Sequence, residues 1–397
     1  MRLRGFLALL AAFLVLAAPA SAHTREEVRA QYVKINDWTE GDLYRSEPSA
    51  SDPYAAGEVR AEVLEDALNY LNFLRWLAGL EAVELDPVLT EIAQYGAVLT
   101  AANGFVSHEP PAPADMDAAF YDKAAYAAAS CNIACLNWTS ADVLRQGMAY
   151  FARDDGEQNL STLGHRRWLL NPTMGYTGFG LANDAAGMSY VTMYAHDLQG
   201  APGAWEYVAW PAAGAFPAEL MSAELAWSIV LNPEIYDTEG AWARLTNLET
   251  GAVYNFPGEG GYFAVDEGGY GAGPCLIFRP TVEEDYEQNQ RWLVEAGTSS
   301  GAAISYEVEM ISLYPVEPSS VEIAPREAQM RPGETLTLTA AVVPDWADDL
   351  SIAWSSSDES VATVENGVVT AVGAGTCEIS ATAVNGEADI CALTVEE

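Results

Sequence analysis

Basic side chains are scarce in this chain of 397 residues, which has 18 lysines and arginines against 57 aspartates and glutamates. Nucleic acids and anionic lipid surfaces are bound through clusters of basic side chains, so this deficit argues against both as partners. Long hydrophobic runs are missing too. After the N-terminal segment, no stretch approaches the roughly 20 apolar residues that a membrane helix needs. We therefore expect no membrane span.

Cysteine and histidine are also rare, with five and four residues respectively. An odd number of cysteines leaves at least one thiol unpaired within the chain, and both a mostly reduced chain and one with a bridge remain open. Cys377 and Cys391 flank an Asn385-Gly386 turn. A two-residue hairpin there puts these cysteines on opposite faces of the strand pair, so a bridge between them would require another register.

The N-terminal residues 1–22 have the pattern of a cleavable secretory signal. An apolar run at 6–18 follows two arginines and ends in small residues, which predicts cleavage before His23 and export of the remaining chain. Residues 23–57 are mixed and polar, and their proline- and serine-rich end at 46–53 favours turns. We interpret this segment as a leader rather than a domain.

The next region, residues 58–200, begins with helical periodicity and ends with strands. Apolar residues recur at intervals of three and four in three predicted helices, at 59–80, 86–103 and 140–153. The second has Asp86 as an N-cap with Pro87 behind it, and stops at Gly104. Strands are predicted at 177–182 and 189–195. The region is therefore expected to be an α+β domain.

Several short motifs of this region occur in a characteristic order. They are Leu71-Asn72-x-x-Arg75, Gly79-Leu80, Leu85-Asp86-x-x-Leu89, Ser107-His108, Gly164-His165-Arg166 and a Gly-x-Gly strand at 178–180. In this order they resemble the CAP superfamily, which groups cysteine-rich secretory proteins, antigen five and pathogenesis-related proteins. The resemblance implies an αβα sandwich with a central cleft that holds two histidines and two acids. By position, His108 and His165 match the two cleft histidines.

The acids match the family less well. Where the family has Gly-Glu-Asn-Ile-Ala, this chain has Ser-Cys-Asn-Ile-Ala, so Cys131 replaces the first glutamate. The resemblance implies a second acid at or after the third helix, where Asp154, Asp155 and Glu157 are all available. We predict that Asp155 and Glu157 bind ligand together with the two histidines.

Three kinds of chemistry are compatible with this set of residues. Two imidazoles, a carboxylate and a thiolate are zinc's usual ligand types, which makes His108 and His165 candidate metal ligands. A cysteine near a histidine can also form a reactive thiolate, so Cys131 with His108 or His165 is the catalytic alternative. Cys131 is otherwise a small buried side chain that fills the floor of the cleft. His196 stands beside Asp197, which predicts a structural pair rather than a ligand.

Two β regions follow. Residues 201–315 alternate strand-like runs with turns and carry tryptophans at short intervals, which predicts a compact β-sandwich with these tryptophans in its core. Asp266, Glu267 and the acids at 283–285 offer oxygen ligands for Ca²⁺ without the spacing of a known calcium loop. Residues 318–397 resemble the bacterial Ig-like group-two domain through Pro332-Gly333-Glu334-Thr335, Trp354-Ser355-Ser356, Ser360-Val361-Ala362-Thr363-Val364 and Gly373-Ala374-Gly375-Thr376.

The sequence thus predicts a secreted multidomain α+β and all-β protein, with an αβα-sandwich CAP domain, a β-sandwich-like domain and an Ig-like β-sandwich. The expected function is to bind a small extracellular ligand or a divalent metal, zinc or calcium, in a two-histidine cleft. The β domains would space the cleft or attach it to a cell-surface component. Two alternatives stay open: an extracellular hydrolase or peptidase that uses the same cleft, and a structural adhesin with a vestigial cleft. We expect binding rather than catalysis.

Overall fold

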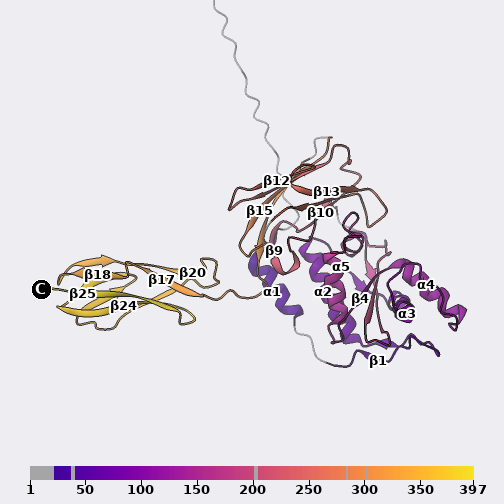
Figure 1. Ribbon diagram of the computed structural model, residues 1–397, viewed down its shortest axis with the longest axis horizontal. Coiled ribbons are helices and arrows are strands. Elements are labelled where there is room, and N and C mark those ends of the chain that lie inside the picture. Colours follow the sequence, from indigo (N-terminus) through magenta and orange to yellow (C-terminus); the bar gives the residue numbers. More distant parts are fainter. Residues whose placement is uncertain (1–21, 37–40, 201–203, 283–284, 300–302) are drawn as a thin grey trace, which may run out of the picture. The chain divides into compact units, whose positions relative to one another are not determined.

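A computed structural model of the chain describes residues 22–36, 41–200, 204–282, 285–299 and 303–397 (Figure 1). The predicted signal peptide therefore lies outside the described residues, except for its last position. The chain separates into two compact units, Met1–Leu313 and Tyr314–Glu397. No helix in the described ranges combines the length and the apolar character needed to cross a bilayer.

The three predicted helices are present. They are α2 (Ala61–Leu77), α3 (Pro87–Asn103) and α5 (Val143–Arg153). The Asp86 side chain accepts the N–H groups of Val88 and Leu89 at 2.7 and 2.9 Å, which satisfies two orphan donors of the first turn of α3. Gly104 ends the helix with a φ of 72°, a conformation that glycine adopts without strain. Local capping therefore places the bounds of α3.

Three further helices were not predicted. They are α1 (Arg25–Ile35), α4 (Ala118–Ser130) and α6 (Gly164–Leu169). Helix α1 departs from the expected leader. Thr24 and Glu27 form a reciprocal capping box at its start, and Val28 is fully buried against the core. The single buried apolar face of this short helix gave too weak a periodicity to stand out from a polar segment.

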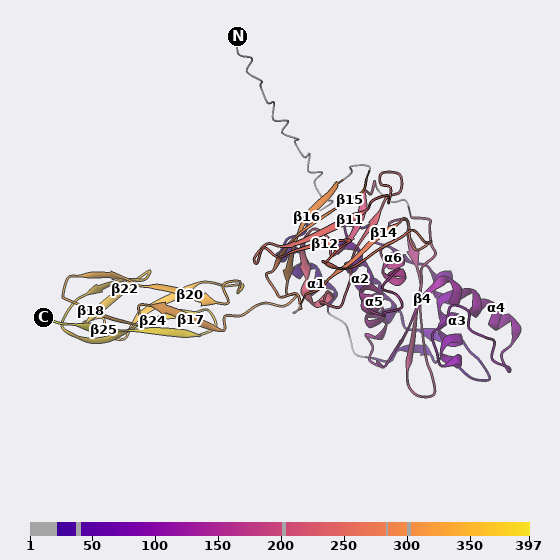
Figure 2. The same ribbon diagram turned by 45° about the horizontal axis from the view of Figure 1, so that its top comes forward.

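A three-stranded antiparallel sheet lies between two layers of helices. Its order is β4 (Cys131–Leu136), β7 (Ser189–Tyr194) and β6 (Phe179–Asn183). Neighbouring residues of a strand face opposite sides of the sheet. Thr192 donates to the Ala93 carbonyl of α3 at 2.7 Å, whereas Val191 packs against Gly147 of α5. Figure 2 shows α3 and α4 on one side of β4 and α2 and α5 on the other. The predicted αβα sandwich is confirmed.

Gly147 makes the close approach of α5 to the sheet possible. A Cβ added there would lie 2.5 Å from Cγ1 of Val191, a fully buried and stiff side chain. We expect Gly147→Ala to destabilise the larger unit by about 1–2 kcal/mol, because overpacking outweighs the gain in helix propensity. Urea unfolding measures this effect. Gly41→Ala, at an open position, is the control, and an alanine at 147 that left stability unchanged would contradict the proposed contact.

The remaining strands of the larger unit form two small pairs and two larger sheets. The pairs are β1 (Tyr44–Ser46) with β2 (Glu58–Val59), and β3 (Glu84–Leu85) with β5 (Tyr176–Thr177). One sheet has the order β13 (Gly261–Asp266), β14 (Cys275–Pro280), β10 (Trp227–Leu231), β8 (Tyr207–Trp210). The other is β12 (Val253–Phe256), β11 (Trp242–Asn247), β15 (Arg291–Gly297), β16 (Ala303–Ile311), β9 (Gly214–Pro217). A short 3₁₀ helix, η1 (Ala218–Leu220), follows β9.

The β region of the larger unit shares its hydrophobic core with the helical region. Trp210 and Trp227 are buried, as predicted, and belong to the same continuous cluster as the buried face of α2. Arg166 of α6 strengthens this connection, because its guanidinium donates to the Ala226 carbonyl at 2.6 Å. The helical region and the β region of the larger unit thus share one continuous hydrophobic core.

The smaller unit is an all-β domain with its own core. Its strands are β17 (Ser320–Ala324), β18 (Glu327–Met330), β19 (Thr335–Thr337), β20 (Thr339–Val343), β21 (Ile352–Ser356), β22 (Ala362–Glu365), β23 (Val368–Ala371), β24 (Gly375–Ala383) and β25 (Ala388–Val395). They pair in the orders β17-β20, β18-β25-β24-β21 and β19-β23-β22. This is the Ig-like β fold that the sequence predicted.

The two Asn-Gly turns of this domain differ. Asn366 and Gly367 both have positive φ, 48° and 81°, and form the expected two-residue hairpin between β22 and β23. At the second turn only Gly386 has positive φ, and the Ala383 N–H donates to the Glu387 carbonyl, so the loop is one residue longer.

The longer loop changes the predicted register of β24 and β25. Cys377 pairs with Leu393, and Ile379 pairs with Cys391. Both cysteines consequently lie on the same buried face, and the prediction of opposite faces was wrong. Both are free thiols.

Candidate functional site

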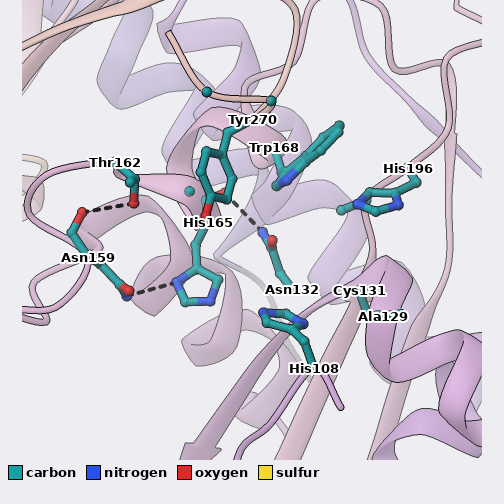
Figure 3. A pocket seen from close by; sticks show the side chains of 14 residues that line it. His108, Ala129, Cys131, Asn132, Asn159, Thr162, His165, Trp168, His196 and Tyr270 are labelled. Atoms are coloured by element: carbon teal, nitrogen blue, oxygen red, sulfur yellow. Dashed lines mark hydrogen bonds between the residues drawn. The ribbon is translucent and has the colours of Figure 1, made fainter. Parts of the chain in front are cut away.

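A pocket of about 550 Å³ in the larger unit collects most of the candidate residues (Figure 3). It is lined by His108; Ala129, Cys131 and Asn132; Asn159 and Thr162; Gly164, His165 and Trp168; Ala195 and His196; and Gly268, Gly269 and Tyr270. We call it the three-histidine pocket. The structure therefore brings together His108 and His165, which are 57 residues apart in the sequence, and adds His196.

His165 is held by a buried carboxylate. Its Nδ1 lies 2.9 Å from Oδ1 of Asp154, whose side chain is completely buried, and the other carboxylate oxygen accepts the backbone N–H groups of His165 and Arg166 at 3.0 and 3.2 Å. Asn159 Nδ2 donates to Oδ1 at 2.9 Å. Because a carboxylate only accepts, we assign the imidazole proton to Nδ1. Nε2 is then the ring nitrogen of His165 that is left for the pocket.

His108 also has an acceptor at Nδ1, but here the acceptor is a backbone carbonyl. Its Nδ1 lies 2.8 Å from the carbonyl oxygen of Ala128, which can only accept, so Nδ1 again carries the proton. His196 packs against the Trp168 ring, with centroids 4.5 Å apart. Burial, and to a smaller extent the electrostatic effect of the neighbouring His108, lowers the pKa of His196 below its ordinary value. His196 therefore stays neutral at neutral pH.

Cys131 lies at the floor of the pocket and is not an activated thiol. Its side chain is buried, and desolvation raises its pKa far above the ordinary value for cysteine. A thiolate, rather than a thiol, is the nucleophile and the metal ligand. The position therefore supports the interpretation of Cys131 as a small buried side chain, and not as a nucleophile.

Alkylation tests the state of Cys131. In the folded chain we expect iodoacetamide to modify the partly exposed Cys135 much faster than Cys131, and to reach Cys131 only after unfolding. Peptide mass spectrometry after timed labelling measures both rates on one sample. Labelling of Cys131 as fast as that of Cys135 would contradict the buried, protonated thiol.

The predicted ligand-binding acids Asp155 and Glu157 lie elsewhere. Asp155 forms an ion pair with Arg153 at 3.4 Å, and the Glu157 side chain is 86 % exposed. Neither lines the three-histidine pocket. The reason is local geometry: Asp154 ends α5 with a φ of 49°, and the left-handed turn directs its carboxylate inward while the chain after it runs along the surface.

The donor set of the pocket does not fit a metal ion. Within the described ranges, the structure has no group of three or more histidine, cysteine, aspartate or glutamate side chains arranged to hold one. Among the residues that the structure describes, Asp154 is the carboxylate that bonds a pocket histidine, and it already accepts four N–H groups. The predicted calcium ligand Asp266 forms an ion pair with Arg167, and Glu267 accepts from Thr238. Residues 283–284 lie outside the described part of the chain.

Several pocket residues were not predicted. Asn132 is buried and donates to the His165 carbonyl at 2.9 Å, and Tyr270 comes from the loop between β13 and β14. His196 was expected to pair with Asp197, but that carboxylate instead accepts the backbone N–H groups of Gly175 and Tyr176. A sequence motif could have indicated only Asn132, which stands next to Cys131 in the family-like segment.

Comparisons with known proteins agree with the motifs. The family model described as the cysteine-rich secretory protein family, CAP, matches residues 68–195, and the model of the bacterial Ig-like domain (group 2) matches residues 318–392. These are the same two families, in the same order, that the sequence resembled.

Two curated relatives come from bifidobacteria. The chain is 40% identical over 104 residues to a 3-O-alpha-D-galactosyl-alpha-L-arabinofuranosidase of Bifidobacterium longum subsp. longum, covering 22% of this chain and 9% of that protein. It is 44% identical over 69 residues to a lacto-N-biosidase of Bifidobacterium bifidum, covering 17% and 6%. The chain thus spans less than a tenth of the length of either relative.

Matches among solved structures are remote. Domains 4 and 5 of the S-layer protein SbsC share 15% identity at a TM-score of 0.21, covering 30% of this chain and 69% of that one. The complex of Dpr11 IG1 with DIP-gamma gives 10% identity and a TM-score of 0.24, covering 43% and 88%. Such low scores carry no conclusion. The family models and the observed folds together identify residues 68–195 of this chain as a CAP domain and residues 318–392 as a bacterial Ig-like domain of group 2.

Proposed function

We propose that this chain is an exported protein whose CAP domain binds an uncharged, hydrogen-bonding ligand in the three-histidine pocket. The Ig-like domain would act as a spacer or surface-attachment module. Export rests on the signal-like residues 1–22, and CAP and Ig-like domains are common in extracellular proteins. This proposal retains the predicted small ligand and drops the divalent metal.

One observation carries the proposal. None of the residues that line the pocket is an aspartate, glutamate, lysine or arginine, although the chain has 57 acidic residues. A charged ligand would lose its hydration without gaining an opposite charge, which is costly. Imidazole nitrogens, two carboxamides and the hydroxyl groups of Thr162 and Tyr270 instead offer donors and acceptors to a neutral ligand.

The same lining argues against hydrolysis. Glycoside hydrolysis ordinarily needs two carboxyl groups that flank the scissile bond, and no carboxylate lines the described pocket. Acyl transfer through Cys131 needs a thiolate, which burial disfavours. The two curated relatives are named as enzymes that act on glycans, and this supports a glycan-rich extracellular setting for the chain without assigning it their reactions.

A thermal-shift screen tests the proposal. The probes are neutral saccharides, N-acetylated dipeptide amides, ZnCl₂ and CaCl₂, each added to the full chain and to His165→Ala. We expect at least one neutral compound to raise the melting temperature of the wild type and to lose this effect in the variant, because a ligand that binds only the folded state stabilises it.

Tyr176→Ala is the matched control for this screen. Tyr176 is exposed and lies outside the three-histidine pocket, so its removal should leave the shift unchanged. A shift produced only by charged compounds, or only by ZnCl₂ with dependence on His165, would overturn the proposal.

A further inference from the structure

We propose that the loop at residues 267–274, between β13 and β14, determines the specificity of the three-histidine pocket, and that Tyr270 is a stacking platform for a neutral saccharide. This inference rests on the proposed function and names its ligand class. The loop belongs to the β region, outside the part of the chain that matches the CAP family. The pocket is therefore a composite of two regions.

Arg167 fixes both ends of the loop. Its guanidinium forms an ion pair with Asp266 at the end of β13, and it donates to the carbonyls of Gly268 and Gly273 at 3.3 and 2.9 Å. Arg167 is buried and belongs to α6, the helix that also carries His165 and Trp168. The position of the loop relative to His165 is thus fixed, because Arg167 bonds to the loop from the helix that carries this histidine.

Tyr270 is placed as an accessible aromatic wall. Its ring lies over Gly164, where an added Cβ would approach within 2.8 Å, and the Arg167 guanidinium lies 5.5 Å from its centroid. It nevertheless remains 38% exposed. Figure 3 shows its ring extending from the loop toward His165, with Trp168 beside it. Because Tyr270 lines the pocket, the exposed part of its ring is available to a ligand.

These groups match the two surfaces of a sugar ring. The C–H groups of one sugar face carry slight positive charge and pack on the negative face of an aromatic ring. The hydroxyl groups around the sugar edge both donate and accept. Carboxamides and imidazoles can donate to and accept from such groups, and Asn132, Asn159 and the three histidines surround the space next to the rings. A sulfated or acidic glycan would find no cationic side chain in the lining.

An array of neutral, sulfated and sialylated oligosaccharides, with a peptide array beside it, tests this inference on the full chain. We expect binding to neutral glycans. For the glycan that binds best, calorimetry should give an affinity about tenfold lower in Tyr270→Ala than in the wild type, because one aromatic contact with the sugar is lost. Tyr270→Phe keeps the stacking face and should lose less affinity than Tyr270→Ala, whereas the exposed control Tyr176→Ala should stay within about twofold of the wild type.

Gly164→Ala provides a second variant that keeps the tyrosine. Its methyl group would displace the Tyr270 ring from its present position, so binding should weaken although no contact group is removed. Melting temperatures of all variants establish that they fold.

The possible outcomes separate this inference from the proposed function. Absence of glycan binding, binding confined to charged glycans, or full affinity in Tyr270→Ala overturns the role of the loop. A peptide ligand lost in His165→Ala but retained in Tyr270→Ala also overturns it, and leaves the proposed function standing. Glycan binding lost in Tyr270→Ala but unaffected by His165→Ala would instead contradict the three-histidine pocket.

Discussion

Replacing Arg75 by methionine is expected to destabilise the larger unit by about 3–5 kcal/mol, because several backbone carbonyls inside the protein would lose a charged hydrogen-bond donor. Arg75 belongs to α2, and its side chain is fully buried. It donates to the carbonyls of Glu81 at 2.9 Å and of Leu169 and Asn171 at 3.0 Å each. Burial lowers its pKa to about 10, which still leaves the guanidinium charged at neutral pH.

Urea unfolding followed by tryptophan fluorescence measures this effect, since nine of the eleven tryptophans belong to the larger unit. Arg45→Met is the matched control, because Arg45 is 77% exposed and its ion pair with Glu58 is a surface contact of little value. Equal stability of the two variants would contradict the structural role of Arg75. The result matters for the site, because Arg75 binds the backbone of Leu169 and Asn171, which follow the pocket residue His165 by only a few positions.

The second large effect is expected at Asp154. Replacement by alanine removes the acceptor for four N–H groups, from His165, Arg166 and Asn159, inside the protein. We expect a loss of about 3–5 kcal/mol of stability, since each buried donor left unpaired costs about 1–3 kcal/mol and some donors will find water. His165 would also lose the bond that fixes its tautomer and ring orientation.

Asp155→Ala is a closely matched control for this experiment. Asp155 is the next residue and is also acidic, but it is exposed and paired only with Arg153 at 3.4 Å. Its removal should change stability by no more than a few tenths of a kcal/mol. Unfolding curves of both variants decide between the two acids. If Asp155→Ala were the more damaging change, the assignment of Asp154 to His165 would be wrong.

The contrast between these two acids shows what the sequence could predict. Capping residues such as Asp86 and Gly104 act on neighbouring backbone groups, so the helix bounds were readable from local chemistry. The resemblance to the CAP family placed His108 and His165 in one cleft. The choice of Asp154 depends on a single left-handed φ angle, which aspartate adopts more readily than most residues, and because Asp155 is also an aspartate no pattern distinguished the two.

Long-range contacts account for the other differences. Tyr270 reaches the pocket only because Arg167, about 100 residues earlier, anchors its loop, and neither residue carries a motif that indicates the other. The register of β24 and β25 likewise depends on whether Asn385-Gly386 forms a two- or three-residue loop, which both residue types allow. Periodicity and motifs identified the elements and the families. They could not identify which loop completes the pocket.

The central claim is that His108, His165 and His196 line one pocket that serves an uncharged ligand. Histidine-selective ¹⁵N labelling tests it most directly, because the chain has only four histidines and His23 lies apart from the others, stacked on Trp76. We predict a proton on Nδ1 of both His108 and His165. A neutral oligosaccharide from the array should shift the signals of all three pocket histidines and leave His23 unchanged, whereas a ligand that shifts one of the three histidines alone, or none of them, would contradict the account.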